Sequence, residues 1–404
     1  MTFPLAQRRG TPPHIFTLVM ATASSALAMN VFLPSLPGMA RHFKTDYAVV
    51  QLAVALYLAA TAVLQLFIGP ASDRFGRRPV LLVCFSIFLT GTLAATFAPT
   101  IEILLCCRVL QAFSAAGMVL GRAIIRDTVG PDEAAGKIGY VTMGMALVPM
   151  IGPVIGGLLD EIYGWQSTFL LTLAFGSVAF VIIWFDLGET NLTPSSSMLA
   201  QVRSYRELIS SERFWGYTLA AAFTSGTFFA FLGGGPYVAT ELLGLSPSQY
   251  GFYFGFVSLG YMAGNFVSGR FSFRFGINRM MIFGNLVTGL GMLVALGPVA
   301  VGHVGALSVF LPMVFVGLGN GMALPNAMAG IVSVRPHISG SASGLGGCLQ
   351  IGGGAALSVL AGALLGPSSG PAPLFAVMLG SSICAVLASF YVINVARRKG
   401  ELTR

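Results

Sequence analysis

The fold of this 404-residue chain is decided by the stretch Gly69-Pro70-Ala71-Ser72-Asp73-Arg74-Phe75-Gly76-Arg77-Arg78. It lies between two runs without a charged residue, 48–68 and 79–99. Each run has about 20 residues, enough to cross the hydrocarbon layer as a helix. The connection is too short to cross the bilayer, so both helices turn back on one side, and its three arginines predict that this side is cytoplasmic. We expect Gly69 and Gly76 to permit the tight backbone.

The composition is typical of a polytopic membrane protein. Hydrophobic residues make up 55% of the chain and charged residues 9%, with a mean hydropathy of +0.82. A soluble protein carries about 25% charged residues, so lipid must cover much of this surface. Of the 22 Lys and Arg, Arg41 and Lys44 are expected outside, Arg108 and Arg122 within a span, and the others on the cytoplasmic side. The net charge of +8 therefore indicates orientation, and no nucleic-acid partner is expected.

Apolar segments predict an all-α fold with twelve transmembrane helices. Polar residues 188–213 interrupt the series and predict a cytoplasmic linker between an N-terminal half, 1–187, and a C-terminal half, 214–404. An even number of spans places both termini in the cytoplasm. The expected spans lie near 15–36, 47–68, 79–98, 101–124, 137–159, 167–187, 214–236, 249–269, 279–300, 304–329, 338–365 and 372–395.

The second half repeats the first at an offset of 200 residues. The stretch 269–276 matches the first at Gly69, Ser72, Arg74, Phe75 and Gly76, with Phe273 in place of Asp73. Two pseudo-symmetric six-helix halves are typical of a transporter whose substrate site lies between them near the membrane midplane.

The pattern G-x-x-x-D-R-x-G-R-R of 69–78 resembles the loop between helices 2 and 3 of the major facilitator superfamily. Met29-Asn30-Val31-Phe32-Leu33-Pro34-Ser35-Leu36-Pro37 and Arg122-Ala123-Ile124-Ile125-Arg126-Asp127 resemble the bicyclomycin/chloramphenicol-resistance (Bcr/CflA) branch of its drug:H⁺ antiporters. The resemblance covers nearly the whole chain. It departs at Asn30, where that branch has an acid.

The resemblance implies a set of gating residues. Asp127 is expected to pair with Arg77, and Asp73 to lie at the N-terminus of span 11, where a carboxylate meets the positive end of the helix dipole. These contacts would hold the halves in the outward-open state. Gly69 belongs to the same element. The sequence Gly152-Pro153-Val154-Ile155-Gly156-Gly157 resembles the G-P-x-x-G-G element of proton-coupled exporters, and we expect Gly152, Pro153 and Gly156 at a contact between the halves.

Span 4 carries the intramembrane charges. A charge in a span costs about 2.5–3.5 kcal/mol on insertion scales and usually faces the interior or a wet cavity. Arg108 and Arg122 share a face, and Gln111 lies on the same side. Arg108 and Gln111 reproduce the R-x-x-Q element that the resemblance ties to proton transfer. A purely structural role for Arg108, and an Arg122 that extends to the interface, are the alternatives.

No carboxylate lies in the middle of a predicted span, so the usual coupling site is absent or displaced, with Glu102, Asp127 and His14 as candidates. An arginine-bearing cavity without an acid favours neutral or anionic amphiphiles. Predicted substrate-site residues that supply neutral hydrogen bonds or apolar surface are Asn30, Asn320, Gln350, Tyr57, Phe228 and Tyr261.

The sequence thus predicts a monomeric, secondary-active efflux transporter of the bacterial inner membrane. It would export drugs such as phenicols or bicyclomycin-like antibiotics, use the proton gradient and need no cofactor. A metabolite (sugar or organic acid) exporter or an uncoupled facilitator remains the alternative. An enzyme or ATP-driven pump is not expected, because H-E-x-x-H, C-x-x-C and the P-loop are missing. The five cysteines have no metal-ligand spacing.

Overall fold

The computed structural model describes residues 12–129, 131–191, 205–302, 304–335, 338–366 and 369–398. All regular secondary structure in these ranges is helical. Nine segments of the described chain are long and apolar enough to cross a membrane. Three further helices, of 33, 26 and 29 residues, complete the twelve crossings that the sequence predicts.

The helices follow one another with short connections. In chain order they are α1 (Ile15–Asn30), the 3₁₀ turn η2 (Leu33–Ser35), α2 (Leu36–Phe43), α3 (Tyr47–Phe75), α4 (Arg77–Thr96), α5 (Ile101–Gln111), the 3₁₀ turn η3 (Ala112–Ser114), α6 (Ala115–Thr128), α7 (Pro131–Tyr163), α8 (Gln166–Asp186), α10 (Glu212–Tyr237), the π-helical turn η4 (Val238–Leu242), α11 (Pro247–Phe275), α12 (Ile277–Ala300), α13 (Ala306–Phe310), α14 (Met313–Ser333), α15 (Ser339–Leu364) and α16 (Ala372–Arg398).

The charged connection at 69–78, which we call the hinge, is shorter than the sequence predicts. Helix α3 continues through Pro70 to Phe75, and α4 begins at Arg77, so Gly76 alone separates them. Gly76 has φ +98°, which favours glycine. The expectation of a tight backbone at Gly69 is wrong, because Gly69 lies within α3.

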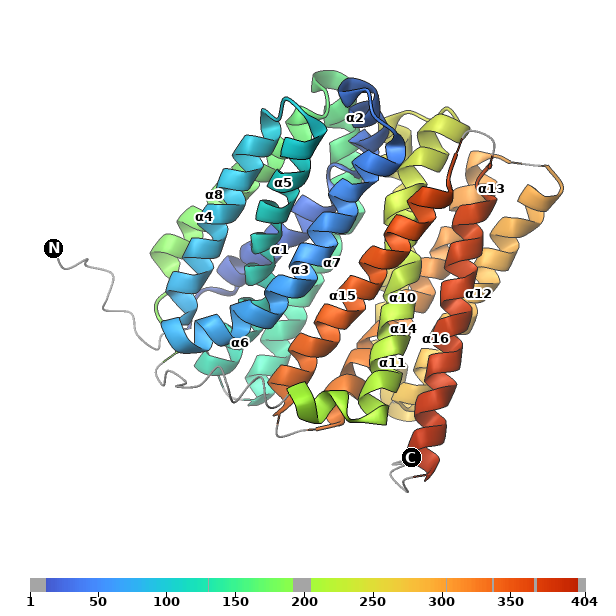
Figure 1. Cartoon of the computed structure of the whole chain (residues 1–404). Helices are drawn as coiled ribbons and strands as arrows, with labels where there is room; N and C mark the ends of the chain where they lie inside the picture. The colour runs from blue at the N-terminus through green and yellow to red at the C-terminus, as the bar shows by residue number, and fades with distance from the viewer. Residues whose placement is uncertain are drawn as a thin grey trace.

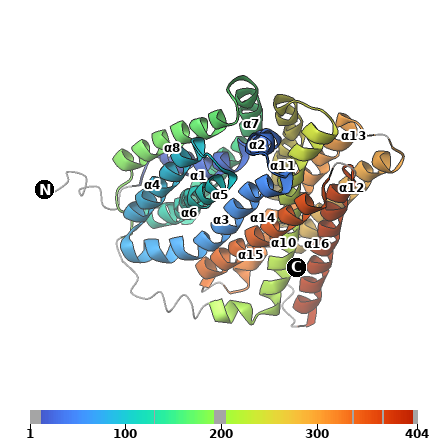
Figure 2. The ribbon, with the colours of Figure 1, turned by 45° about the horizontal axis from the view of Figure 1, so that its top comes forward.

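The helices form two groups that lie side by side (Figure 1). The first half contains α1 to α8, and the second half contains α10 to α16. Helix α3 packs along α15, and α7 packs along α11; Figure 2 shows both pairs from a second direction. We call the end of the bundle with the hinge the hinge side, and the end with α2 and η4 the α2 side. Helix α1 begins and helix α16 ends on the hinge side (Figure 1).

Helix α1 packs closely on α7 because Gly156 has no side chain. A Cβ on Gly156 would overlap the carbonyl oxygen of Val31, just beyond the end of α1. Where lipid replaces water, helices associate mainly through such close packing. Gly255 of α11 offers a contrast, since no heavy atom lies within 4 Å of the position of its Cβ.

We predict that Gly156→Ala destabilises the protein, because α1 and α7 must separate to admit the methyl group. Overpacking of this kind costs about 1–3 kcal/mol. Gly255→Ala is the matched control and should leave stability unchanged or slightly raised, since alanine favours a helix by about 1 kcal/mol over glycine. Thermal unfolding of the purified variants measures the difference. Equal melting temperatures for the two variants would contradict the packing argument.

Candidate transport site and gates

Arg108 of α5 is enclosed within the first half. Its side chain is 1% exposed. Nε donates to the carbonyl of Ala53 at 2.9 Å and Nη1 to that of Ala28 at 3.0 Å, so the guanidinium ties α5 to both α3 and α1. Nη1 also donates to Oε1 of Gln111 at 2.6 Å. All these partners belong to the first half. In this conformation Arg108 therefore does not open onto the space between the halves, where the sequence placed it.

Two aromatic rings flank this guanidinium. Its carbon lies 4.1 Å from the ring centroid of Phe32 and 4.5 Å from that of Tyr57. A desolvated cation–π contact contributes about 2 kcal/mol, which offsets part of the cost of burying the charge. Nη2 of Arg108 has no hydrogen-bond partner in the described part of the chain. The first half thus supplies the acceptors and the two rings that surround the guanidinium, and only Nη2 has no acceptor among the described residues.

A polar cluster connects Arg108 to neighbouring helices. The Tyr57 hydroxyl lies 2.9 Å from the Ser114 hydroxyl and donates to the Ser25 carbonyl at 3.0 Å. Nε2 of Gln111 donates to the Thr92 hydroxyl at 3.0 Å. The structure therefore brings together three predicted site residues, Arg108, Gln111 and Tyr57, but it does so inside the first half.

Asn30 ends α1 and is also buried in the first half. Its exposed fraction is 0%, and Nδ2 donates to the Ala26 carbonyl at 2.7 Å. Its Oδ1 has no partner among the described residues. A Cβ on Gly152 of α7 would lie 4.0 Å from the Cβ of Asn30. Asn30 therefore sits at the packed α1–α7 contact.

The G-P-x-x-G-G element of α7 does not all face the second half. The nearest neighbours of Gly152 and Gly156 belong to the first half, with Gly156 against Val31. Pro153 points elsewhere, because one residue turns a helix by about 100°. Its carbonyl meets Gly251 of α11 in the second half. The interpretation of Gly152 and Gly156 as contacts between the halves is thus corrected, whereas Pro153 does lie at such a contact.

Arg122 of α6 occupies a different environment from Arg108. Its side chain is exposed, and its charge lies within electrostatic range of the Tyr261 phenol on α11. Helix α6 belongs to the first half and α11 to the second. Of the two span-4 arginines, Arg122 is therefore the exposed one and the one whose charge reaches a residue of the second half.

The predicted site residues of the second half have partners within that half. Nδ2 of Asn320 donates to the Thr227 hydroxyl at 2.8 Å. The ring of Phe228 lies 5.9 Å from that of Phe229. Gln350 of α15 is partly exposed. Asn320 is therefore engaged in packing, while Gln350 keeps an accessible side chain.

The hinge carries an ion-pair cluster, Asp73, Arg77 and Asp127, which we call the hinge gate. Nε of Arg77 donates to Oδ2 of Asp127 at 2.9 Å, so the ion pair that the resemblance implies is present. Nη1 of Arg77 lies 2.5 Å from Oδ1 of Asp73 and donates to the Ser72 hydroxyl. No heavy atom lies within 4 Å of a Cβ placed on Gly344, near the start of α15. In this conformation Asp73 pairs with Arg77, and its latching to α15 stays a prediction.

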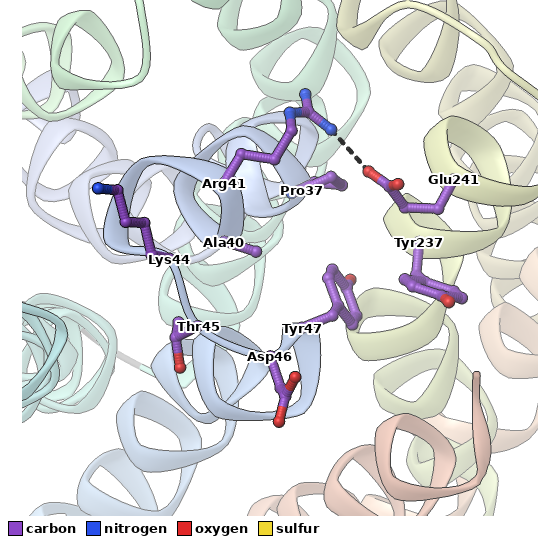
Figure 3. Close-up of a pocket in the computed structure, with 9 residues that line it drawn as sticks. All are labelled: Pro37, Ala40, Arg41, Lys44, Thr45, Asp46, Tyr47, Tyr237 and Glu241. Carbon is purple, nitrogen blue, oxygen red and sulfur yellow. Dashed lines mark hydrogen bonds and ion pairs between the residues drawn. The ribbon is translucent and has the colours of Figure 1, made fainter. Parts of the chain in front are cut away.

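On the α2 side the two halves are joined. Nη1 of Arg41 donates to Oε1 of Glu241 across the halves at 2.6 Å (Figure 3). The Tyr47 hydroxyl donates to the Gly233 carbonyl at 2.7 Å, and the rings of Tyr47 and Tyr237 lie 4.9 Å apart. These side chains border a surface pocket of about 510 Å³.

Gln51 of α3 fills a notch in the second half. It is 2% exposed, and its Nε2 donates to the Ser358 carbonyl and lies 3.3 Å from the Ser358 hydroxyl. A Cβ on Gly233 or Gly362 would overlap the Gln51 amide. The notch thus exists because two glycines leave room for one side chain from the other half.

Sequence reasoning missed Arg41, Glu241 and Gln51. A signal for the first pair was available, because Arg41 and Glu241 are 200 residues apart, the offset of the repeat. Equivalent positions of two halves related by a two-fold axis meet where that axis passes. The Gln51 contact had no such signal, since its glycine notch is formed only when α10 and α15 pack together.

Contacts between the halves gather toward the α2 side. They include Arg41 with Glu241, Gln51 with Ser358, and the backbone N–H of Ser248, which donates to Glu161 at 3.0 Å. These contacts therefore join the halves at the α2 side, and the side chain of Arg122 is exposed.

Comparisons with known proteins agree with this architecture. The family profile described as Major Facilitator Superfamily matches residues 18–350 and 235–403. The chain is 28% identical over 370 residues to Multidrug resistance protein D of Escherichia coli, covering 91% of this chain and 92% of that protein. It is 25% identical over 393 residues to the Bicyclomycin resistance protein homolog of Haemophilus influenzae, covering 96% of this chain and 98% of that protein. It is 29% identical over 334 residues to the Chloramphenicol resistance protein of Pseudomonas aeruginosa, covering 80% of this chain and 78% of that protein.

A solved structure shares the fold. The crystal structure of peptide transporter POT in complex with sulfate matches with a TM-score of 0.77 and 15% identity, covering 96% of this chain and 97% of that one. The three sequence relatives support the bicyclomycin/chloramphenicol-resistance branch that the motifs of span 1 and span 4 predict.

We predict that Arg108→Lys destabilises the protein more than Arg122→Lys does. A lysine cannot donate to two carbonyls and also lie between two rings, so buried acceptors lose their partners. Disrupting a buried charge network costs about 3–5 kcal/mol, whereas an exposed substitution usually stays within about 0.5 kcal/mol. Thermal unfolding in detergent provides the measurement. A melting temperature for Arg108→Lys as high as that of Arg122→Lys would refute the structural role of Arg108.

We predict that Gln51→Ala opens the α2 side, because the substitution removes a buried hydrogen bond between the halves worth about 1 kcal/mol or more. Spin labels at positions 48 and 243, on opposite halves, would report the opening as a longer distance. Val63→Ala on the same helix is the control, since the Val63 side chain is 53% exposed. If both variants give the same distances, the Gln51 notch does not hold the halves together.

Proposed function

This chain belongs to the Major Facilitator Superfamily, and we propose that it exports small neutral or anionic amphipathic compounds by alternating access. It is a multi-pass membrane transporter rather than an enzyme. Relatives named for resistance to multiple drugs, bicyclomycin and chloramphenicol support drugs of the phenicol or bicyclomycin type as substrates.

The charge of the space between the halves carries the proposal on substrate class. The side chain of Arg122 is exposed, and its charge lies within electrostatic range of Tyr261 on the other half. In the membrane-crossing helices whose bounds are given above, every acidic residue lies in the first or last turn. A cavity with a guanidinium and no carboxylate has no reason to select cations. It suits a neutral or anionic molecule with polar groups at one end.

The exported compound is proposed to exchange for protons. Asn30 is not the coupling group, because an amide takes up no proton in the physiological range. The same residue favours a second candidate function, an uncoupled facilitator or a metabolite (sugar or organic acid) exporter of the same fold. The two functions differ in whether a proton gradient changes the transport rate.

We propose that the protein acts as a monomer in the bacterial inner membrane, with the hinge side in the cytoplasm. The support is the distribution of charge. Arg74, Arg77 and Arg78 lie at the first hinge and Arg270 and Arg274 at the second. Short cytoplasmic loops are enriched in such residues. With this orientation both termini are cytoplasmic.

Export is tested by expressing the chain in a bacterial host stripped of its own efflux pumps. Tolerance to chloramphenicol should rise, and vesicles containing the purified protein should move chloramphenicol faster when a pH gradient is imposed. Unchanged tolerance to a panel of neutral and anionic drugs, with the protein present in the membrane, would count against drug export. A chloramphenicol transport rate that is the same with and without the pH gradient would support the uncoupled facilitator.

We predict that Arg122→Gln slows export of an anionic dye such as fluorescein more than export of chloramphenicol. The loss of a charge-assisted contact should reduce dye transport about tenfold. Arg74→Gln, which removes an exposed arginine of the hinge, is the matched control and should affect both compounds alike. Initial rates in vesicles give the comparison. Equal loss for the dye and the neutral drug would show that Arg122 does not contact the substrate.

A further inference from the structure

One carboxylate accepts hydrogen bonds from three backbone N–H groups at the hinge. Oε1 of Glu189 accepts from the N–H of Arg77 at 2.9 Å and of Asn191 at 2.8 Å, and Oε2 accepts from that of Arg78 at 3.2 Å. The first N–H groups of α4 have no acceptor within the helix, and its cap residue Gly76 has no side chain to supply one. Glu189 therefore caps α4 from 112 residues away, at the end where the helix dipole favours negative charge.

The absence of a side chain at Gly76 creates the space for this carboxylate. A Cβ on Gly76 would overlap Oε2 of Glu189 and lie 2.9 Å from its Cδ. The second hinge has the same backbone shape, since Gly276 has φ +81° beside +98° for Gly76. No heavy atom of the described chain lies within 4 Å of a Cβ on Gly276, and α12 has no side-chain cap. The repeat thus preserves the glycine but not the carboxylate.

Asn191 holds the other side of the hinge. Its Nδ2 donates to the carbonyl of Asp73 at 2.7 Å and lies 3.4 Å from that of Ser72, both in the last turn of α3. Residues 189 and 191 therefore bridge the end of α3 and the start of α4. Arg77, whose backbone N–H binds Glu189, is also the residue whose guanidinium holds the hinge gate together.

We propose that Glu189 is a positioning residue of the hinge gate. It fixes the backbone of Arg77 and Arg78, and thereby directs the Arg77 guanidinium toward Asp73 and Asp127. It also ties residues 189 and 191, which follow the last helix of the first half, to the hinge. This inference rests on the proposed alternating-access transport, in which the hinge gate stabilises the state closed on the hinge side.

The test measures the gate without a substrate. Cysteines introduced at positions 74 and 340, on opposite halves at the hinge side, carry spin labels in a chain whose five native cysteines are replaced. Distances are measured in lipid nanodiscs. Glu189→Ala should lower the ratio of the hinge-closed to the hinge-open population about tenfold, because Arg77 loses its fixed backbone. Gly276→Ala, with similar backbone strain and no carboxylate to displace, should leave the ratio unchanged.

A double-mutant cycle separates positioning from general damage. Gly76→Ala alone should reproduce the effect of Glu189→Ala, since its Cβ displaces the carboxylate. Combined with Glu189→Ala it should add little, because the carboxylate is already gone. Additive effects of the two substitutions, or an equal shift in Gly276→Ala, would overturn the proposal.

Glu189→Gln is measured as well, in case the Glu189→Ala variant does not reach the membrane. The glutamine keeps the shape of the side chain and one acceptor oxygen, so this variant should fold and shift the population ratio less, in the same direction. A population ratio equal to that of the parent chain would refute the role of Glu189. The proposed function is tested separately, because a wild-type chain that moves no chloramphenicol would contradict drug export and leave the distance measurement intact.

Discussion

A guanidinium inside the membrane needs acceptors that lipid does not supply, and this constraint organises the first half. Arg108 takes its acceptors from the backbone of α1 and α3, and two aromatic rings cover its faces. Because its charge is satisfied by three helices at once, those helices cannot separate without exposing it. Arg108 therefore holds α1, α3 and α5 together, as the proposed rocking of two intact halves requires.

The polar contacts between the halves are of a different kind. Arg41 with Glu241 is an exposed ion pair, and such pairs contribute about 0–1 kcal/mol. Gln51 sits in a notch of two glycines, from which it can withdraw without breaking a helix. A buried charge is thus satisfied inside the first half, whereas the polar contacts between the halves are an exposed ion pair and neutral hydrogen bonds. The proposed alternating access would depend on this difference, since the contacts on the α2 side would have to break while each half stays intact.

The parts of this arrangement that sequence could predict are those set by composition and local spacing. Twelve crossings follow from apolar length, and the contact of Arg108 with Gln111 follows from a spacing of three residues on a helix. The direction in which that pair points depends on how α5 packs against α1 and α3, so the predicted position between the halves was wrong for this conformation. Pro70 and Gly69 suggested a loop, but the helix continues through them because the flanking residues keep their other backbone hydrogen bonds.

The two hinges show how a duplicated element can acquire unequal roles. The first contains Asp73, Arg77 and the capping carboxylate of Glu189, all engaged in ion pairs or hydrogen bonds. At the second hinge Phe273 stands in place of Asp73 and is fully exposed, and the space beside Gly276 is empty of described atoms. A fully exposed phenylalanine can contribute contact area but no ion pair. Among the described residues the ion pairs and the capping carboxylate thus belong to the first hinge, although the backbone shape of the two hinges is the same.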